Sequence, residues 1–149
     1  IDTIYFDEKS AFEVGAPQIV EVLKGANVTY DYEVVSLLRK DSLDLTDADR
    51  ALIHETIASD PCRRVVVTHG TDTMVETARV LSAIDDKVIV LTGSMQPARF
   101  RVTDASYNIA SAMTAVQLLG PGVYIAMNGR IFDPRTAQKN RELNRFEVR

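Results

Sequence analysis

The stretch Val65-Val66-Val67-Thr68-His69-Gly70-Thr71-Asp72-Thr73 decides the fold of this chain. Its apolar residues are typical of a buried strand, and the strand leads into a turn at a glycine. Thr73 and Glu76 have the spacing of a capping box, so we expect a helix to begin at Thr73. Thr71 and Asp72 then lie between a strand's carboxyl end and a helix's amino end, where open α/β sheets bind ligands. A threonine beside an aspartate favours a polar substrate with an amino group over a phosphate.

The composition is that of a soluble globular domain. The chain has 149 residues, 46% hydrophobic and 26% charged, which corresponds to a single domain. A net charge of −4 argues against nucleic-acid partners and against binding to an anionic membrane. The lone Cys62 cannot form an internal disulfide, and no apolar run is long enough to span a bilayer. We therefore expect a cytoplasmic protein with one domain over residues 1–149.

Short apolar runs alternate with segments of helical periodicity, which is the pattern of βαβ units. It predicts a three-layer α/β/α fold with a mainly parallel, doubly wound sheet. We expect central strands at residues 65–68, 88–92 and 123–127, because their valines, isoleucines and leucines suit strands covered on both faces. A strand fragment is expected at residues 4–6 and a strand-rich segment at residues 28–38, where apolar and polar residues alternate.

Helix boundaries are marked by proline, glycine and capping residues. One helix is expected to open near Pro17 and to end at Gly25. Another begins at Thr46, with Asp49 at the capping-box position, and the longest covers residues 104–119. Their inward-facing residues are predicted to be Leu52, Ile53, Ile57, Ile109, Met113 and Val116.

Two connections are longer than usual, at residues 7–15 and 93–103. Long loops at strand ends are often functional, although surface padding is the commoner explanation. Of the two histidines, His69 is expected to set the shape of its turn and His54 to lie on a helix surface. Neither histidine nor Cys62 has a ligand-spaced partner, so no metal site is predicted.

Three runs occur in order, each at the end of an expected strand. They are Thr68-His69-Gly70-Thr71-Asp72-Thr73-Met74, Thr92-Gly93-Ser94-Met95-Gln96-Pro97 and Met127-Asn128-Gly129. Together they resemble the amino-terminal catalytic domain of the bacterial-type L-asparaginases, amidohydrolases that release ammonia from asparagine and sometimes from glutamine. The resemblance covers nearly the whole chain, and residues 1–15 are most similar to short, single-domain members. It implies hydrolysis of L-asparagine to L-aspartate and ammonia by a threonine nucleophile, without a metal or an organic cofactor.

The resemblance also implies roles for individual residues. Thr71 matches the second catalytic threonine of these enzymes, and Asp72 matches the carboxylate that grips the α-amino group of the substrate. Lys139 matches the lysine that completes a Thr-Lys-Asp set. Tyr5 falls where the family places a mobile active-site tyrosine, and Ser42 matches a serine that holds the substrate's α-carboxylate.

Such a set is chemically reasonable. A threonine hydroxyl is a weak nucleophile, and it needs either a base beside it or a cation that favours its alkoxide. A lysine can serve in either role. The developing oxyanion needs hydrogen-bond donors, which the turn at Gly93-Ser94 can supply from its backbone. We therefore count Gly70 and Ser94 as substrate-binding residues, together with Ser42 and Asp72.

Each of these residues has an ordinary structural interpretation as well. The Thr71-Asp72 pair would then bond only the backbone of its own turn. Lys139 lies in a charged segment, residues 135–145, that we expect to be irregular and solvated. Tyr5 would be a packing residue, and Ser42 a turn or helix-entry serine.

The chain departs from the family pattern at three places. The family's primary nucleophile stands in a Thr-Gly-Gly-Thr turn after the first strand, and these 149 residues contain no such run. Leu43 stands where the two-domain enzymes have a glutamine that contacts the substrate, and residues 146–149 match the start of their linker to a second domain. We therefore expect one more strand of about five or six residues before Ile1, ending in a turn with the nucleophilic threonine.

Three functions remain open from the sequence. The leading one is L-asparagine hydrolysis, and a related one is a glutaminase-asparaginase of broader amide specificity. A non-catalytic amino-acid-binding domain with the same fold belongs to a different class. Because a single domain leaves its strand-end crevice open, we also expect a symmetric homodimer or a higher homo-oligomer.

Overall fold

The computed structural model describes residues 1, 3–6, 11–98 and 101–149, and gives the backbone alone for 3–6 and 11–14. Within these ranges the central sheet has the strand order β3-β4-β5-β6. Strands β3 (Arg64–Thr68), β4 (Val88–Thr92) and β5 (Gly122–Met127) are parallel, and β6 (Arg130–Phe132) runs antiparallel to β5. The three central strands predicted from the sequence are confirmed.

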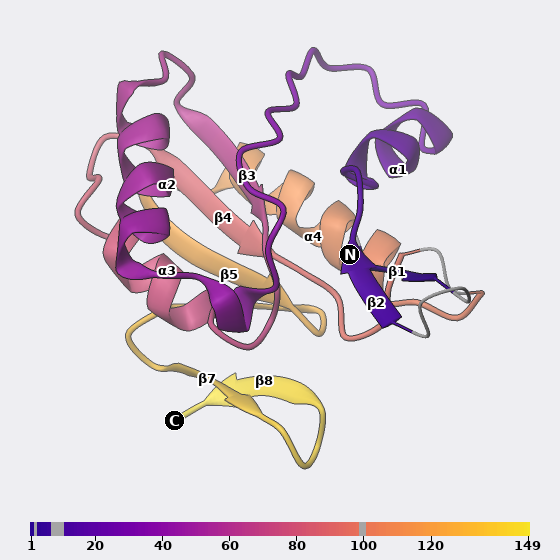
Figure 1. The fold of residues 1–149 in the computed structure, drawn as a ribbon. Coiled ribbons are helices and arrows are strands. Elements are labelled where there is room, and N and C mark those ends of the chain that lie inside the picture. The colour runs from indigo at the N-terminus through magenta and orange to yellow at the C-terminus, as the bar shows by residue number, and fades with distance from the viewer. Residues whose placement is uncertain (2, 7–10, 99–100) are drawn as a thin grey trace.

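Helices cover both faces of this sheet, so the three-layer prediction is confirmed (Figure 1). On one face, Ile89 and Leu91 of β4 pack with residues of α2 (Asp47–Ser59) and α3 (Met74–Leu81). On the other face, Val88 and Val90 pack with α4 (Ala105–Leu118). Alternate residues of one strand point to opposite faces, which explains why residues 88–91 of β4 are all apolar. Helix α1 (Ile19–Gly25) adds Ile19 and Leu23 to a smaller cluster with Ile109 of α4.

The two capping boxes predicted from the sequence have different outcomes. At the start of α2, the Thr46 hydroxyl accepts from the Asp49 backbone N–H at 3.2 Å, and the Asp49 carboxylate accepts from the Thr46 N–H at 2.8 Å. That box is confirmed. Thr73 occupies the N-cap position of α3, but its side chain makes no capping bond, so the second box is wrong. Leu52, predicted to face inward, is 42% exposed.

The prediction of a strand-rich segment at residues 28–38 is wrong, because the structure contains no strand there. Alternation favours an extended chain, but a strand also needs a neighbour for its backbone hydrogen bonds, and none of the described strands pairs with this segment. Leu37 and Leu38 pack on the core, whereas Val35 is 60% exposed. A short 3-10 helix, η2 (Ser42–Asp44), follows.

Two hairpins stand outside the central sheet (Figure 1). Strand β1 (Thr3–Phe6) confirms the predicted fragment, and it pairs with β2 (Ala11–Val14) inside the segment predicted as a loop, of which residues 7–10 lie outside the described part. Strands β7 (Ala137–Asn140) and β8 (Arg145–Val148) form the second hairpin. The segment around Lys139, expected to be irregular, is therefore a strand, because Ala137 and Phe146 bury their side chains in the core.

At the amino ends of the strands, Lys87 is a buried lysine with an exposed fraction of 4%. Its ammonium donates hydrogen bonds to the backbone carbonyls of Asp60, at 2.5 Å, and of Cys62, at 3.0 Å. Lys87 thereby fastens the turn that leads into β3, and Cys62 in that turn is exposed.

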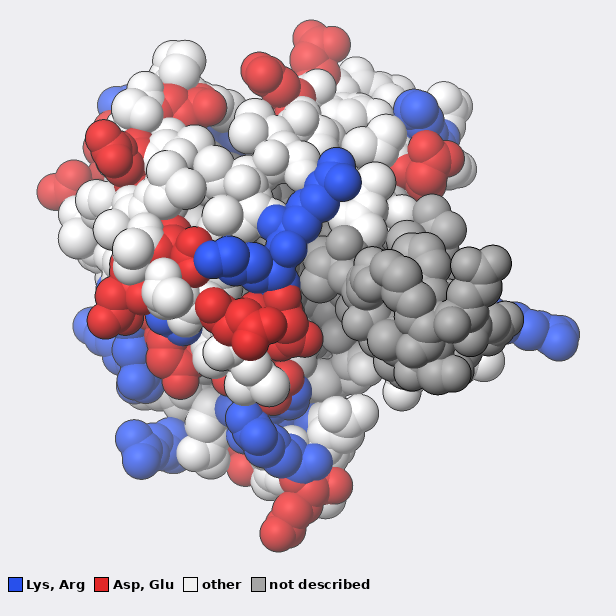
Figure 2. All heavy atoms as spheres, in the orientation of Figure 1, with Lys and Arg blue, Asp and Glu red and all other residues white. Residues whose placement is uncertain are grey.

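Acidic and basic side chains are interspersed over the face shown in Figure 2. This distribution agrees with the small net charge of −4. No helix in the described part of the chain combines the length and the apolar composition that crossing a bilayer requires.

Candidate active site

The loop after β3, residues 69–73, is organised around His69. The backbone N–H of His69 donates to the Thr92 carbonyl at 2.9 Å, and its side chain is 8% exposed. Ring atom Nδ1 lies 2.7 Å from the Gly70 carbonyl, which can only accept, so Nδ1 carries the proton. Nε2 then accepts from the Thr77 hydroxyl at 2.9 Å. Burial lowers the pKa of His69, so the ring stays neutral and shapes the turn, as the sequence predicted.

Lys139 of β7 reaches this loop from 68 residues away in the sequence. Its Nζ donates to Thr71 Oγ1 at 2.8 Å and to Asp72 Oδ1 at 3.0 Å. Thr71 is buried, and the side chains of Lys139 and Asp72 are 15% and 28% exposed. The hydroxyl, the ammonium and the carboxylate that the resemblance groups are therefore in contact, at a place that solvent still reaches.

Sequence reasoning missed a second cation at this place. Nη2 of Arg141 lies 3.3 Å from Asp72 Oδ1, so one carboxylate oxygen faces both Lys139 and Arg141. Arg141 follows the end of β7, and its side chain is 69% exposed. Its position two residues after Lys139 could have indicated this contact, because residues two apart on an extended chain point to the same side.

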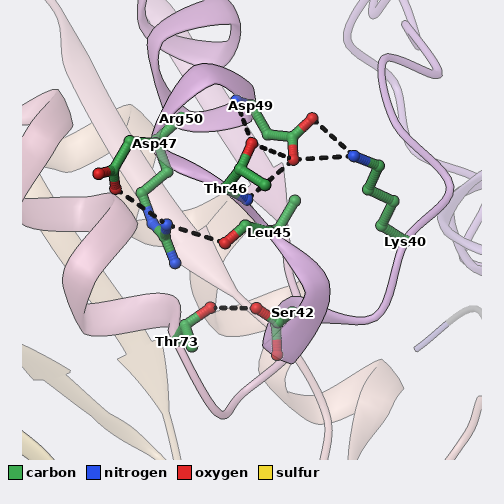
Figure 3. A network of polar contacts seen from close by, with 8 residues as sticks. All are labelled: Lys40, Ser42, Leu45, Thr46, Asp47, Asp49, Arg50 and Thr73. Carbon is green, nitrogen blue, oxygen red and sulfur yellow. Dashed lines mark hydrogen bonds and ion pairs between the residues drawn. The ribbon is translucent and has the colours of Figure 1, made fainter.

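Ser42 is pressed against the same loop from η2 (Figure 3). Its exposed fraction is 3%, and its backbone carbonyl accepts a 2.6 Å hydrogen bond from the Thr73 hydroxyl. A Cβ atom on Gly70 would lie 2.6 Å from Ser42 Oγ and 2.7 Å from Ser42 Cβ. Any side chain at position 70 would have to displace Ser42, which explains why a glycine stands there.

The segment that carries Ser42 is braced by the start of α2 (Figure 3). Lys40 donates to both oxygens of Asp49 at 2.9 Å, and these bonds lower the pKa of Asp49 to about 2. Arg50 donates from Nη1 to the Leu45 carbonyl at 3.0 Å. The segment with Ser42 is therefore held at two places, by the start of α2 and by the loop after β3.

The turn after β4 lies beside that loop. A Cβ atom on Gly93 would lie 2.5 Å from the His69 carbonyl oxygen and 3.2 Å from the methyl carbon of Thr71. The carboxylate of Asp104 accepts from the backbone N–H groups of Met95 and Gln96, at distances of 3.0 to 3.1 Å. Asp104, which supports this turn, was not among the site residues predicted from the sequence.

The structure thus brings five predicted residues to the carboxyl ends of β3 and β4: Ser42, Gly70, Thr71, Asp72 and Lys139. Ser94 follows Gly93 in the neighbouring turn, and its Oγ is buried without a hydrogen-bond partner among the described residues. Tyr5 lies in β1 opposite Phe12, and its side chain falls outside the described part.

Two hollows in the described part of the chain are lined by residues outside the Thr71 cluster. A groove of about 760 Å³ between α1 and α4 is lined by Val22, Leu23, Ile109 and Met113, among others. A smaller hollow of about 370 Å³ is lined by residues that include Asp104 and Asn128. Among the described residues, no group of three or more His, Cys, Asp or Glu side chains is arranged to hold a metal ion.

The chain is similar to known proteins over nearly its whole length. The family described as "Asparaginase, N-terminal" matches residues 3–147. The glutaminase-asparaginase of Acinetobacter glutaminasificans is 30% identical over 139 residues, which are 87% of this chain and 42% of that protein. L-asparaginase 2 of Bacillus subtilis is 37% identical over 92 residues, covering 58% of this chain and 24% of that protein.

Solved structures agree with these matches. The thermostable L-asparaginase from Thermococcus kodakarensis has a TM-score of 0.82 at 26% identity, covering 99% of this chain and 48% of that one. The probable cytoplasmic L-asparaginase from Campylobacter jejuni has a TM-score of 0.76 at 28% identity, covering 90% of this chain and 45% of that one. The chain spans less than half the length of these relatives. The sequence match over residues 3–147 and the shared fold lead to one conclusion: this chain belongs to the asparaginase N-terminal domain family.

Proposed function

We propose that this domain supplies the Thr-Lys-Asp set for hydrolysis of L-asparagine to L-aspartate and ammonia. The observation that supports the proposal is the position of Lys139, whose Nζ lies 2.8 Å from the Thr71 hydroxyl and 3.0 Å from the Asp72 carboxylate. These contacts join a threonine hydroxyl, a cation or base, and an anion at the carboxyl ends of parallel strands.

The proposed chemistry is acyl transfer through a threonine hydroxyl. A threonine oxygen adds to the carbon of the side-chain amide, the carbonyl oxygen becomes an oxyanion, and ammonia leaves with a proton when the carbonyl re-forms. Water then releases aspartate from the ester. Lys139 moves the hydroxyl proton or favours the alkoxide, and Asp72 holds Lys139 in place. This sequence of steps requires no metal or organic cofactor.

The remaining predicted residues are proposed to bind the substrate. Asp72 is 28% exposed and can accept charge-assisted hydrogen bonds from the substrate's α-ammonium group. Ser42 packs against Gly70 in the loop after β3. The Ser42 side chain and the Gly70 backbone are proposed to bind the α-carboxylate of the substrate. Ser94 is proposed to contribute donors to the oxyanion from the neighbouring turn.

A second candidate function is a glutaminase-asparaginase of broader specificity. It is favoured because the relative that matches 87% of this chain is named a glutaminase-asparaginase. Ammonia release from L-asparagine and from L-glutamine, measured with the complete protein, tests both candidates. Asparagine turnover alone supports the first proposal, and comparable turnover of both amides supports the second. No ammonia from either amide, with asparagine still binding in calorimetry, would show an amino-acid-binding domain instead.

The setting of this reaction is part of the same proposal. We place the protein in the cytoplasm and expect it to act on a small molecule as a homodimer or higher homo-oligomer. The Campylobacter jejuni structure supports the location, because that protein is described as a probable cytoplasmic L-asparaginase.

A further inference from the structure

Lys139 lies on a hairpin that does not belong to the central sheet. Within the described residues, β7 pairs with β8 and with no other strand. A two-stranded hairpin alone is at best marginally stable in water. The contacts that dock this hairpin on the domain therefore determine where the Lys139 ammonium lies.

One docking contact lies directly opposite Lys139. In the β7–β8 register the partner of Lys139 is Phe146. The backbone N–H of Phe146 donates to the side-chain oxygen of Asn128 at 2.8 Å. The Phe146 ring is 3% exposed, and its centroid lies 6.3 Å from that of Phe132 in β6. The hairpin is thus fastened by one directional bond and one apolar anchor at the position that faces the lysine.

Asn128 is itself held from the protein interior. Its φ of 51° is a left-handed conformation, which asparagine, aspartate and glycine tolerate better than other residues. Its backbone N–H donates at 3.2 Å to the side-chain oxygen of Asn108, a residue with 0% exposure. The amide nitrogen of Asn108 donates to the Gly93 carbonyl at 3.0 Å and to Asp104 at 2.8 Å. The same network therefore supports the turn after β4 and the hairpin of β7 and β8.

We propose that Asn128 is a positioning residue for Lys139, acting through the backbone of Phe146. The inference rests on the proposed function, because it assigns a purpose to the geometry of the Thr71–Lys139 contact. Among the described residues, Asn128 forms no hydrogen bond with Thr71 or Asp72; it fixes the strand position across from the lysine. It also gives the Met127-Asn128-Gly129 run a physical role.

Two substitutions separate the side-chain acceptor from the backbone conformation. Asn128→Gly keeps the left-handed turn and the N–H bond to Asn108 but removes the acceptor for Phe146. Asn128→Asp keeps both the turn preference and an acceptor oxygen. For asparagine hydrolysis by the complete protein, Asn128→Gly should lower kcat by roughly 10²-fold, the effect of an ångström-scale misplacement. KM should stay near its original value, since Lys139 acts on the reacting hydroxyl, and Asn128→Asp should restore most of kcat.

Lys139→Met is the reference that separates this inference from the proposed function. If Lys139→Met abolishes turnover and Asn128→Gly leaves kcat intact, the positioning role is wrong and the proposed function stands. If Lys139→Met has no effect, the proposed function itself is wrong. Equal losses in both Asn128 variants would also overturn the positioning role.

Amide hydrogen exchange covers the case in which Asn128→Gly does not fold. In the unsubstituted protein, the Phe146 amide should be protected far more than the amides of the hairpin turn at residues 141–144. Exchange of Phe146 at the rate of that turn would show that Asn128 does not hold the hairpin.

Discussion

The hydroxyl of Thr73 donates a 2.6 Å hydrogen bond to the backbone carbonyl of Ser42, across 31 residues of sequence. This bond joins the loop after β3 to the segment before α2, and Ser42 is buried between them. Because Ser42 and the Thr71-Asp72 pair come from separate segments, their relative position depends on such cross-links. We therefore expect the candidate site to be sensitive to small changes in packing as well as to loss of the Thr71, Asp72 or Lys139 side chain.

Substitution of Gly70 tests this packing. Gly70→Ala should destabilise the protein by about 1–3 kcal/mol and raise KM for asparagine, because the new Cβ would meet Ser42 Oγ at 2.6 Å. Gly120→Ala is the matched control, since a Cβ there meets nothing within 4 Å. Urea unfolding and steady-state ammonia release measure the two effects. Equal behaviour of the two variants would contradict the tight Ser42–Gly70 contact.

Thr71→Ala should remove most turnover. The substitution deletes the hydroxyl that accepts from Lys139 but leaves the Lys139–Asp72 pair, so we expect a stability change of about 1 kcal/mol or less. Thr71→Ser keeps the hydroxyl and should retain much of the activity. Ammonia release by the complete protein is the measurement. A fully active Thr71→Ala protein would eliminate Thr71 as a catalytic residue.

Lys139→Met should lower turnover sharply with a modest change in substrate binding. Methionine keeps the apolar stem and removes the ammonium, and under the proposed function that ammonium acts mainly in the transition state. Lys24→Met is the control, because the Lys24 side chain is 65% exposed and pairs with Glu21 at 3.7 Å. Separate kcat and KM values are required. Unchanged kcat would mean that Lys139 serves only as an ion-pair partner of Asp72.

His69 should make folding stability depend on pH. Its pKa in the folded protein is below the ordinary value of 6.5, so between these two pKa values the unfolded chain binds more protons. Stability is then fully present above 6.5 and falls as the pH drops through that window. Urea midpoints at about pH 7.5 and about pH 5.5 measure the loss. His69→Gln should show a smaller loss over the same interval, and an equal loss would assign the effect to other groups.

We expect the complete protein to form a symmetric homodimer, the commonest closed assembly. A second copy placed over the carboxyl ends of β3 and β4 would shield the Lys139 and Asp72 side chains, which are 15% and 28% exposed. Sedimentation velocity at micromolar protein concentration tests the expectation, and a monomer at that concentration would refute it.

Local patterns predicted the parts of the fold that local chemistry determines. Strands β3, β4 and β5 were predictable because each is an apolar run whose length and composition are sufficient evidence. The capping boxes show the limit of this approach. Thr46 and Thr73 both have an acidic residue three positions later. The Thr73 hydroxyl, however, donates its hydrogen bond to the carbonyl of Ser42, a partner that no local pattern reveals.

Two other features depended on contacts that are distant in sequence. Residues 28–38 alternate as a strand does, yet strand formation depends on a neighbour elsewhere in the chain. The charged segment around Lys139 lacks an apolar strand pattern, and it becomes a strand because β8 pairs with it and Phe146 is buried. For the site, the resemblance named Thr71, Asp72 and Lys139, whereas Arg141 and the Asp104–Asn108 support emerged from the structure.

The Lys87 side chain is buried at the amino ends of the strands, so its reaction with external reagents depends on the state of the fold. Both carbonyls that it contacts belong to the turn before β3, and only 4% of the residue is exposed. Reagents that acylate lysines, and trypsin, can reach this position only when that turn opens. The rate at which Lys87 is labelled therefore measures how often the turn before β3 opens. Substitutions at the Thr71 cluster do not touch this turn, so the labelling rate measures unfolding independently of the site.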